Sequence, residues 1–215
     1  MPTLYGASPS PFVRKVRVVM HEKGIAYEHE FVGPGSRKPE FRAISPLGRI
    51  PGLVDGDLSV SDSSVICAYL ERTHPDPPMF PRDPKQYARA LWYEEYGDTA
   101  LAAVATFGTF GRKIVAPLRG AAVDHAAIEK TLTDELPPVF DYLEGETAGR
   151  EYLVGDRFSI ADVSIATHFV NFGHAGYQVD AGRWPRLAAW VKRHLARPIF
   201  IELAEQDRQL LGLGG

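Results

Sequence analysis

The sequence predicts a small α/β domain with a mixed sheet, followed by an all-helical domain. Within residues 1–75 the patterns run strand, helix, strand and loop, and then a hairpin and a second helix. Five prolines in the eleven residues from His74 to Pro84 indicate a linker, which we place at 76–84. In residues 85–215 strand patterns nearly disappear and apolar residues recur at helical spacing.

The first strand and helix are predicted from a short apolar run and the turn residues after it. Residues 3–6 form that run, and the loop that follows reads Ala-Ser-Pro-Ser. From Pro11 onward apolar side chains fall at helical spacing, and Pro11 suits the first turn of a helix that Gly24 ends. Residues 27–32 alternate in polarity at first and predict a second strand.

A hairpin and a capped helix complete the first domain. The polar stretch that starts at Gly33 is predicted as a loop. Residues 50–60 hold two apolar runs around an Asp-Gly pair, which predicts a β-hairpin. Ser61-Asp62-Ser63-Ser64 then precedes apolar residues at helical spacing, so a helix is expected to start there.

Five helical patterns predict the second domain. They cover residues 87–114, 124–143, 160–171, 184–196 and 199–211. The third opens with Ser159-Ile160-Ala161-Asp162, a capping box, and Phe158 and Val163 are placed as its hydrophobic staple. Asp162 is therefore predicted to determine the fold rather than to take part in chemistry.

The composition excludes several classes of function. Apolar residues make up 45% and charged residues 24% of the chain, which is ordinary for a globular protein. The net charge of −3 gives no reason to expect a nucleic-acid partner. No window approaches the ~20 apolar residues of a membrane span, and the first residues do not resemble a signal peptide. A cytoplasmic protein that does not bind membranes is expected.

Ser10-Pro11, at a strand-to-helix junction, is the first candidate for chemistry. A helix amino terminus exposes unpaired N–H groups and a partial positive charge, so it stabilises an anion. A hydroxyl there adds a hydrogen-bond donor, and a thiolate held this way has a lowered pKa. The alternative is that Ser10 simply caps the helix. Local sequence leaves both interpretations open.

Two further candidates lie downstream. Ile50 precedes a proline and is therefore held extended, with its N–H and C=O available to another chain. The Ile50–Pro51 bond is expected to be trans on local grounds, since most such bonds are. At the next helix start Asp62 is suited to an ammonium group and Ser63 to a carboxylate. Capping is again the alternative.

Other catalytic patterns are absent from the sequence. The seven histidines show no spacing such as HExxH, and neither Gly-x-Ser-x-Gly nor a phosphate-loop pattern occurs. No metal site is therefore expected. The single cysteine, Cys67, excludes an internal disulfide. It lies on the apolar side of its helix and is predicted to be buried and inert.

In order and spacing these motifs resemble the cytosolic glutathione S-transferases, especially serine-type bacterial or phi- and tau-like members. The matching stretches are "SPSPFVRKVRVVMHEKGIAYE", "FRAISPLGRIPGLVDGDLSVSDSSVICAYLE" and "FSIADVSIA", and the resemblance covers about residues 3–205. It implies a thioredoxin-like first domain that binds glutathione. The helical second domain would contribute the electrophile site.

The resemblance also implies a role for each candidate. Ser10 would be the catalytic residue and would stabilise the glutathione thiolate, although Ser8 in the same loop is a competitor. The residues that would hold the tripeptide are Lys38, Arg49, Ile50, Pro51, Asp62 and Ser63.

Each of these residues would meet a different part of glutathione. Ile50, before a cis Pro51, would pair its backbone with the cysteinyl unit. Asp62 and Ser63 would bind the γ-glutamyl end, although many relatives have glutamate where this chain has Asp62. Lys38, with Arg37 as a second candidate, would meet the glycine carboxylate. Arg49 would also reach the tripeptide.

Four phenylalanines are candidates for an apolar cleft that accepts an aromatic electrophile. They are Phe12, Phe107, Phe110 and Phe172. The alternative is that these side chains fill the core of the helical domain.

The implied function is conjugation of glutathione, as co-substrate, to apolar electrophilic small molecules, a detoxification reaction without any other cofactor. A homodimer is expected by resemblance. One alternative is a non-catalytic glutathione-binding scaffold. Another is a glutathione-dependent peroxidase or a thiol-disulfide oxidoreductase, although no cysteine lies near Ser10.

Overall fold

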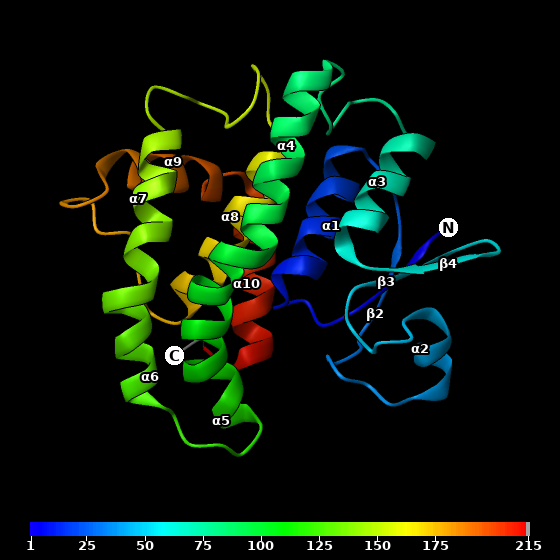
Figure 1. Ribbon diagram of the computed structural model, residues 1–215. Helices are drawn as coiled ribbons and strands as arrows, with labels where there is room; N and C mark the ends of the chain where they lie inside the picture. Colours follow the sequence, from blue (N-terminus) through cyan, green and yellow to red (C-terminus); the bar gives the residue numbers. More distant parts are fainter. Residues whose placement is uncertain (214–215) are drawn as a thin grey trace.

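The computed structural model describes residues 1–213 and has a sheet domain beside a helical domain (Figure 1). The elements of the first domain are β1 (Thr3–Tyr5), α1 (Pro11–Glu22), β2 (Glu28–Glu30), α2 (Pro39–Ile44), β3 (Gly52–Asp55), β4 (Leu58–Ser61) and α3 (Ser63–Thr73). The strands form one mixed sheet in the order β2-β1-β3-β4. β1 runs parallel to β2 and antiparallel to β3, and β3 and β4 form the hairpin.

Two details of this domain differ from the prediction. The second strand is shorter than residues 27–32 and covers only Glu28–Glu30, which is exposed along its length. The segment predicted as a loop contains the helix α2, whose first residue is Pro39. Two apolar side chains anchor α2: Phe41, which is 2% exposed, and the partly buried Ile44. Two anchors in a six-residue helix give little helical periodicity, so the pattern did not reveal α2.

The second domain consists of helices, as predicted. Its elements are α4 (Pro84–Tyr96), η1 (Gly97–Val115), α5 (Ala116–Leu118), α6 (His125–Lys130), η2 (Thr131–Glu135), α7 (Leu136–Glu146), α8 (Ile160–His174), α9 (Pro185–Leu195) and α10 (Pro198–Leu211). The predicted fold class is confirmed. Among residues 1–213 no helix is both long and apolar enough to cross a membrane.

The first two predicted helices of this domain are longer than their patterns. α4, η1 and α5 form one continuous rod that starts at Pro84, because Asp83 caps it by accepting from the N–H groups of Lys85 and Gln86. Within the rod the turns of η1 are wider, and the N–H of Ala116 bonds to the C=O of Gly111, five residues back. α6, η2 and α7 form the second rod in the same way.

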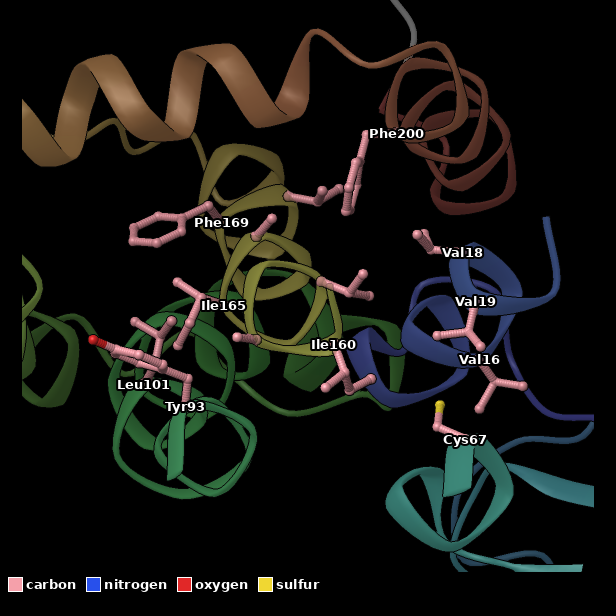
Figure 2. Close-up of a cluster of buried hydrophobic side chains, with 14 of the residues drawn as sticks. Val16, Val18, Val19, Cys67, Tyr93, Leu101, Ile160, Ile165, Phe169 and Phe200 are labelled. Carbon is pink, nitrogen blue, oxygen red and sulfur yellow. The ribbon is translucent and has the colours of Figure 1, made fainter. Parts of the chain in front are cut away.

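α8 is the central helix of the second domain, and most of its residues are buried. It crosses η1 so closely that a Cβ on Gly97 would lie 2.8 Å from the backbone oxygen of Ser164. Figure 2 shows apolar side chains from both domains in one cluster, including Val16 of α1, Cys67 of α3, Ile165 of α8 and Phe200 of α10. The core is therefore continuous across the domain boundary.

The predicted burial of Cys67 is confirmed, since its side chain is free and 0% exposed. Burial raises the pKa of this thiol far above its usual range, although Lys15 opposes that shift. The thiol is therefore neutral and closed to solvent.

Asp162 is a structural residue, as predicted. It is 0% exposed, and its carboxylate accepts from the N–H groups of Leu153 at 2.8 Å and Ser159 at 3.0 Å. The Ser159 hydroxyl donates to it at 3.2 Å, which completes the capping box of α8. The carboxylate thus ties the preceding loop to the first turn of the central helix.

We expect Asp162→Ala to lower the free energy of unfolding by about 2–4 kcal/mol, because two buried N–H groups lose their acceptor. The matched control is Asp124→Ala, which removes an exposed cap of α6 that accepts only from Ala127. That control variant should lower the free energy of unfolding by about 1 kcal/mol. Urea unfolding of both variants measures the difference, and equal losses would contradict this role of Asp162.

A buried ion pair joins the two domains. Arg14 of α1 and Asp207 of α10 are both 0% exposed, and the Nε of Arg14 donates to Asp207 at 3.2 Å. A second bond from Arg14 Nη2 completes a two-pronged contact. Burial alone would raise the pKa of Asp207, but the charge of Arg14, the nearby ring of His174 at 3.8 Å and hydrogen bonds from Ser8 and Arg14 together lower it to about 2.

This ion pair predicts acid sensitivity. The pKa of Asp207 is lower in the folded chain than its ordinary value of 3.8, so its stabilising contribution is complete above pH 4 and disappears as the pH falls toward 2. The shift corresponds to about 2 kcal/mol. We therefore expect the free energy of unfolding of Asp207→Asn to fall less than that of the wild type as the pH is lowered from 6 to 2. Urea unfolding across this pH range measures the difference. The exposed Asp134→Asn should follow the wild type.

Candidate functional site

The register of the sheet brings three distant segments to one edge. Tyr5 pairs with Gly52, and Gly52 pairs with Ser61, so these residues form one row across β1, β3 and β4. The next residues beyond that row are Gly6, Pro51 and Asp62. The N–H of Asp62 donates to the C=O of Pro51 at 3.2 Å.

Gly6 lets the first two segments approach closely. A Cβ on Gly6 would collide with Val13 and would lie 3.5 Å from the Cβ of Ile50. The loop that leads from Gly6 to Ser10 therefore begins beside Ile50. The candidates Ser10, Ile50 and Asp62 thus belong to segments that meet at this edge of the sheet.

Ser10 is the N-cap residue of α1. Its Oγ accepts a hydrogen bond from the N–H of Val13 at 3.5 Å, and its side chain is half-buried. Within residues 1–213 no acceptor receives its hydroxyl hydrogen. No acidic residue occupies the first turn of α1. A hydroxyl donor and a helix amino terminus are therefore both available to an anion at this point.

Ser8, the competitor, has different neighbours. Its hydroxyl donates to Asp207 Oδ1 at 2.6 Å and accepts from Arg17 Nη1 at 2.7 Å. Because the hydroxyl hydrogen of Ser8 already has a buried carboxylate acceptor, only Ser10 of the two serines has a hydrogen free to donate.

Pro9, between the two serines, is attached to the second domain. Its C=O accepts from Asn171 Nδ2 at 3.0 Å and from Arg14 Nη2 at 3.4 Å. Asn171 also accepts from Arg14 Nη1 at 2.8 Å. These residues were not predicted, because Asn171 lies 162 residues from Pro9 and Asp207 lies 193 from Arg14. The arginine in "SPFVRK" was the only local signal.

Asp62 caps α3 in a strained conformation. Its φ is +88°, a value that costs a residue with a side chain roughly 1–3 kcal/mol and that concentrates at functional sites. Its Oδ1 accepts from the N–H groups of Ser64 at 2.9 Å and Val65 at 3.2 Å. Oδ2 accepts no hydrogen bond from residues 1–213. Asp62 is exposed, whereas Ser63 is 3% exposed.

Lys15 holds the start of α3 against the second domain. It is 0% exposed, and its Nζ lies 3.0 Å from Glu94, 2.7 Å from Asp98 and 3.1 Å from Ser64 Oγ. Burial would lower the pKa of Lys15, but the two carboxylates raise it overall, so the ammonium stays charged. Ser64 directly follows Ser63, so this buried charge supports the segment that begins with Asp62.

The Ile50–Pro51 peptide bond is cis, as the family resemblance implies and against the expectation from local sequence. Asp76–Pro77 is also cis and was not predicted. No hydrogen bond joins the N–H or C=O of Ile50 to another group of residues 1–213. Both groups of Ile50 are therefore unpaired within the described residues, and the residue as a whole is 9% exposed.

The basic candidates lie on the segment around α2. Lys38 is the N-cap residue of α2, and Lys38, Arg37 and Arg49 are all exposed. Within the described part of the chain no carboxylate pairs with any of them. Arg42, which was not predicted, donates to the C=O groups of Ser36 at 2.8 Å and Pro46 at 2.7 Å, and so fixes this loop.

The four phenylalanines separate into two pairs. Phe12, in the first turn of α1 and two residues after Ser10, stacks on Phe107 with ring centroids 6.3 Å apart. Phe107 is 57% exposed, so this pair is open to solvent. Phe110 and Phe172 are 4% and 3% exposed. Both fill the core, where Phe172 packs on Phe140 and Tyr177.

Two hollows of about 390 and 700 Å³ lie around the linker, the start of α4 and the loop before α8. None of the candidate residues lines them. Among residues 1–213 no group of three or more histidine, cysteine, aspartate or glutamate side chains could hold a metal ion. This edge of the sheet instead combines the unpaired backbone of Ile50 with the helix amino terminus at Ser10, groups that are suited to a peptide-like ligand and to an anion.

Comparisons with known proteins give the same family for both domains. Family models of the glutathione S-transferase N-terminal and C-terminal domains match residues 4–78 and 84–193. Glutathione S-transferase F13 from Arabidopsis thaliana is 30% identical over 214 residues, which covers 94% of each chain.

Two solved structures from bacteria are also similar. A glutathione S-transferase from Rhodospirillum rubrum F11 superposes with a TM-score of 0.85 at 28% identity, covering 94% of this chain and 91% of that one. FzlA from C. crescentus has a TM-score of 0.83 at 26% identity, with coverage of 94% and 91%. Both family models, the full-length relative and the sheet domain packed on a helical domain show that this chain belongs to the glutathione S-transferase family.

Proposed function

We propose that this protein is a glutathione transferase that joins the thiol sulfur of glutathione to apolar electrophilic molecules. The observation that carries the proposal is the free hydroxyl of Ser10 at the amino terminus of α1, on the loop that starts beside Ile50. Membership of the family supports the class of reaction.

The proposed catalytic step begins with loss of the thiol proton to solvent. Ser10 donates a hydrogen bond to the sulfur anion, and the amino terminus of α1 adds its partial positive charge, so the pKa of the thiol falls. The thiolate then attacks an electrophilic carbon. A carbon–sulfur bond forms, and a leaving group such as halide departs with the electron pair of the broken bond.

The rest of the tripeptide is held by groups of matching charge. Asp62 Oδ2 is suited to the γ-glutamyl ammonium and the N–H and hydroxyl of Ser63 to its carboxylate. The unpaired backbone groups of Ile50, next to Pro51, are suited to the cysteinyl unit. The exposed cations Lys38, Arg37 and Arg49 supply a partner for the glycine carboxylate.

The electrophile is proposed to bind on the stacked pair of Phe12 and Phe107. Phe12 follows Ser10 by two residues, Phe107 stacks on it, and the pair presents an open apolar surface. Phe110 and Phe172 are not part of this proposal, because both are buried. A homodimer and a cytoplasmic location complete the proposal, both on the basis of the family.

A scaffold that binds glutathione without conjugating it is the second candidate. The two candidates differ in their response to loss of Ser10. A peroxidase or disulfide reductase would use the same thiolate, but the buried Cys67 offers it no second thiol.

Ser10→Ala should lower kcat for conjugation of an aromatic halide roughly 100-fold, as loss of one donor to a developing or bound anion does. It should also raise the pKa of the bound glutathione thiol, followed by the ultraviolet absorbance of the thiolate against pH. The reason is that the sulfur loses its only hydroxyl donor.

Ser10→Asp separates this role from helix capping. The carboxylate keeps an acceptor for the Val13 N–H, so the melting temperature should be preserved, whereas its charge repels a thiolate. Activity should therefore fall at least as far as in Ser10→Ala. Wild-type binding of glutathione with no conjugation across a panel of electrophiles would favour the scaffold instead.

Asp62→Asn should weaken glutathione binding about tenfold, since one charge-assisted bond to the ammonium is lost while the cap acceptor remains. Isothermal titration calorimetry measures the dissociation constant. The control is Asp83→Asn, because Asp83 Oδ1 accepts from an equivalent pair of backbone N–H groups, those of Lys85 and Gln86, and lies at the linker. If both variants bind glutathione with the same affinity, Asp62 is not part of the binding site.

A further inference from the structure

The loop that carries Ser10 is fastened to the second domain at two consecutive residues. The Ser8 hydroxyl donates to Asp207 of α10 at 2.6 Å, and the Pro9 C=O accepts from Asn171 of α8 at 3.0 Å. Asp207 and Asn171 are both 0% exposed. These contacts place side chains of two helices from the second domain directly on the residues that precede Ser10.

Two buried arginines, Arg14 and Arg17, hold the residues that contact the Ser8–Pro9 segment in place. Arg14 bonds to Asp207, to Asn171 Oδ1 at 2.8 Å and to the C=O of Thr167 at 2.9 Å. Arg17 donates to Ser8 at 2.7 Å and to Gln206 of α10 at 2.8 Å. Both polar atoms of the Asp207 and Asn171 side chains have hydrogen-bond partners, so neither residue can move without breaking several bonds.

From this geometry we infer that Asp207 and Asn171 are positioning residues for Ser10, so that the helical domain sets the direction of the catalytic hydroxyl. The inference rests on the proposed function of Ser10. Neither side chain touches the proposed ligand. They act on Ser10 through Ser8 and Pro9.

Loss of these contacts is therefore expected to lower kcat more than it lowers the affinity for glutathione. The proposed tripeptide-binding groups lie on other segments, around α2, Ile50 and the start of α3. A shift of the Ser8–Pro9 backbone therefore moves the Ser10 hydroxyl relative to the sulfur but leaves those groups in place. A misplacement of about 1 Å at a reacting centre costs up to about 100-fold in rate.

The test compares Ser8→Ala and Asp207→Asn with the wild type. We expect each to lower kcat about tenfold and to raise the pKa of bound glutathione, with little change in its dissociation constant. Ser8→Thr, which keeps the hydroxyl, should retain wild-type values. If Asp207→Asn fails to fold because Arg14 is left without a counter-charge, Ser8→Ala decides alone, since it leaves the Arg14–Asp207 pair intact.

The matched control is Glu22→Gln. Glu22 of α1 pairs with Arg197, the N-cap residue of α10, at 3.2 Å, so it joins the same two helices without touching the Ser8–Pro9 segment. This variant should have the kcat and thiol pKa of the wild type. If Glu22→Gln lowers kcat as much as Ser8→Ala does, the effect comes from weaker packing between the domains, and the inference is wrong.

A double-mutant cycle shows whether Ser8 acts through Ser10. In a Ser10→Ala background, Ser8→Ala should cause no further loss of kcat, because the hydroxyl that Ser8 helps to orient is already absent. A further tenfold loss would mean that Ser8 contacts the thiolate itself and would overturn the inference. A wild type that forms no thiolate with bound glutathione would instead overturn the proposed function.

Discussion

Two adjacent cations, Arg14 and Lys15, are completely buried on α1, and the arrangement of the domains depends on satisfying both of them. An unpaired charge in the interior costs far more than a protein of this size can tolerate. Their counter-charges come from the other domain: Asp207 on α10 for Arg14, and Glu94 and Asp98 on the first rod for Lys15. α1 lies between the sheet and the helices, so its charges fix both (Figure 1).

Each cation also supports one side of the proposed glutathione site. Arg14 and its partners hold Ser8 and Pro9, which leaves the Ser10 hydroxyl as the free donor of the loop. Lys15 bonds to Ser64 and so supports the start of α3, where Asp62 and Ser63 lie. The sheet register brings the third segment, Ile50–Pro51, to the same edge. Interdomain packing and the geometry of the site therefore have a common physical origin.

Local patterns predicted what local interactions decide. The hairpin, the capping box at Ser159 and Asp162, and the N-cap position of Ser10 all depend on residues a few positions apart, and they were predicted correctly. α2 was missed because it has six residues and only Phe41 and Ile44 anchor it, which is too short a pattern to show helical periodicity. Phe110 and Phe172 could not be separated from Phe107 by sequence, since exposure depends on which helix packs against each ring. The partnership of Ser8 with Asp207 spans 199 residues, so no local pattern contains it.

The central claim is that Ser10, and not Ser8, donates to the sulfur of glutathione because Ser8 is already bonded to the second domain. A crystal structure of the protein with bound glutathione tests it directly. The account predicts Ser10 Oγ within about 3.2 Å of the sulfur, with the Ser8 hydroxyl still on Asp207. A sulfur that contacts Ser8, or that neither serine approaches, would contradict it.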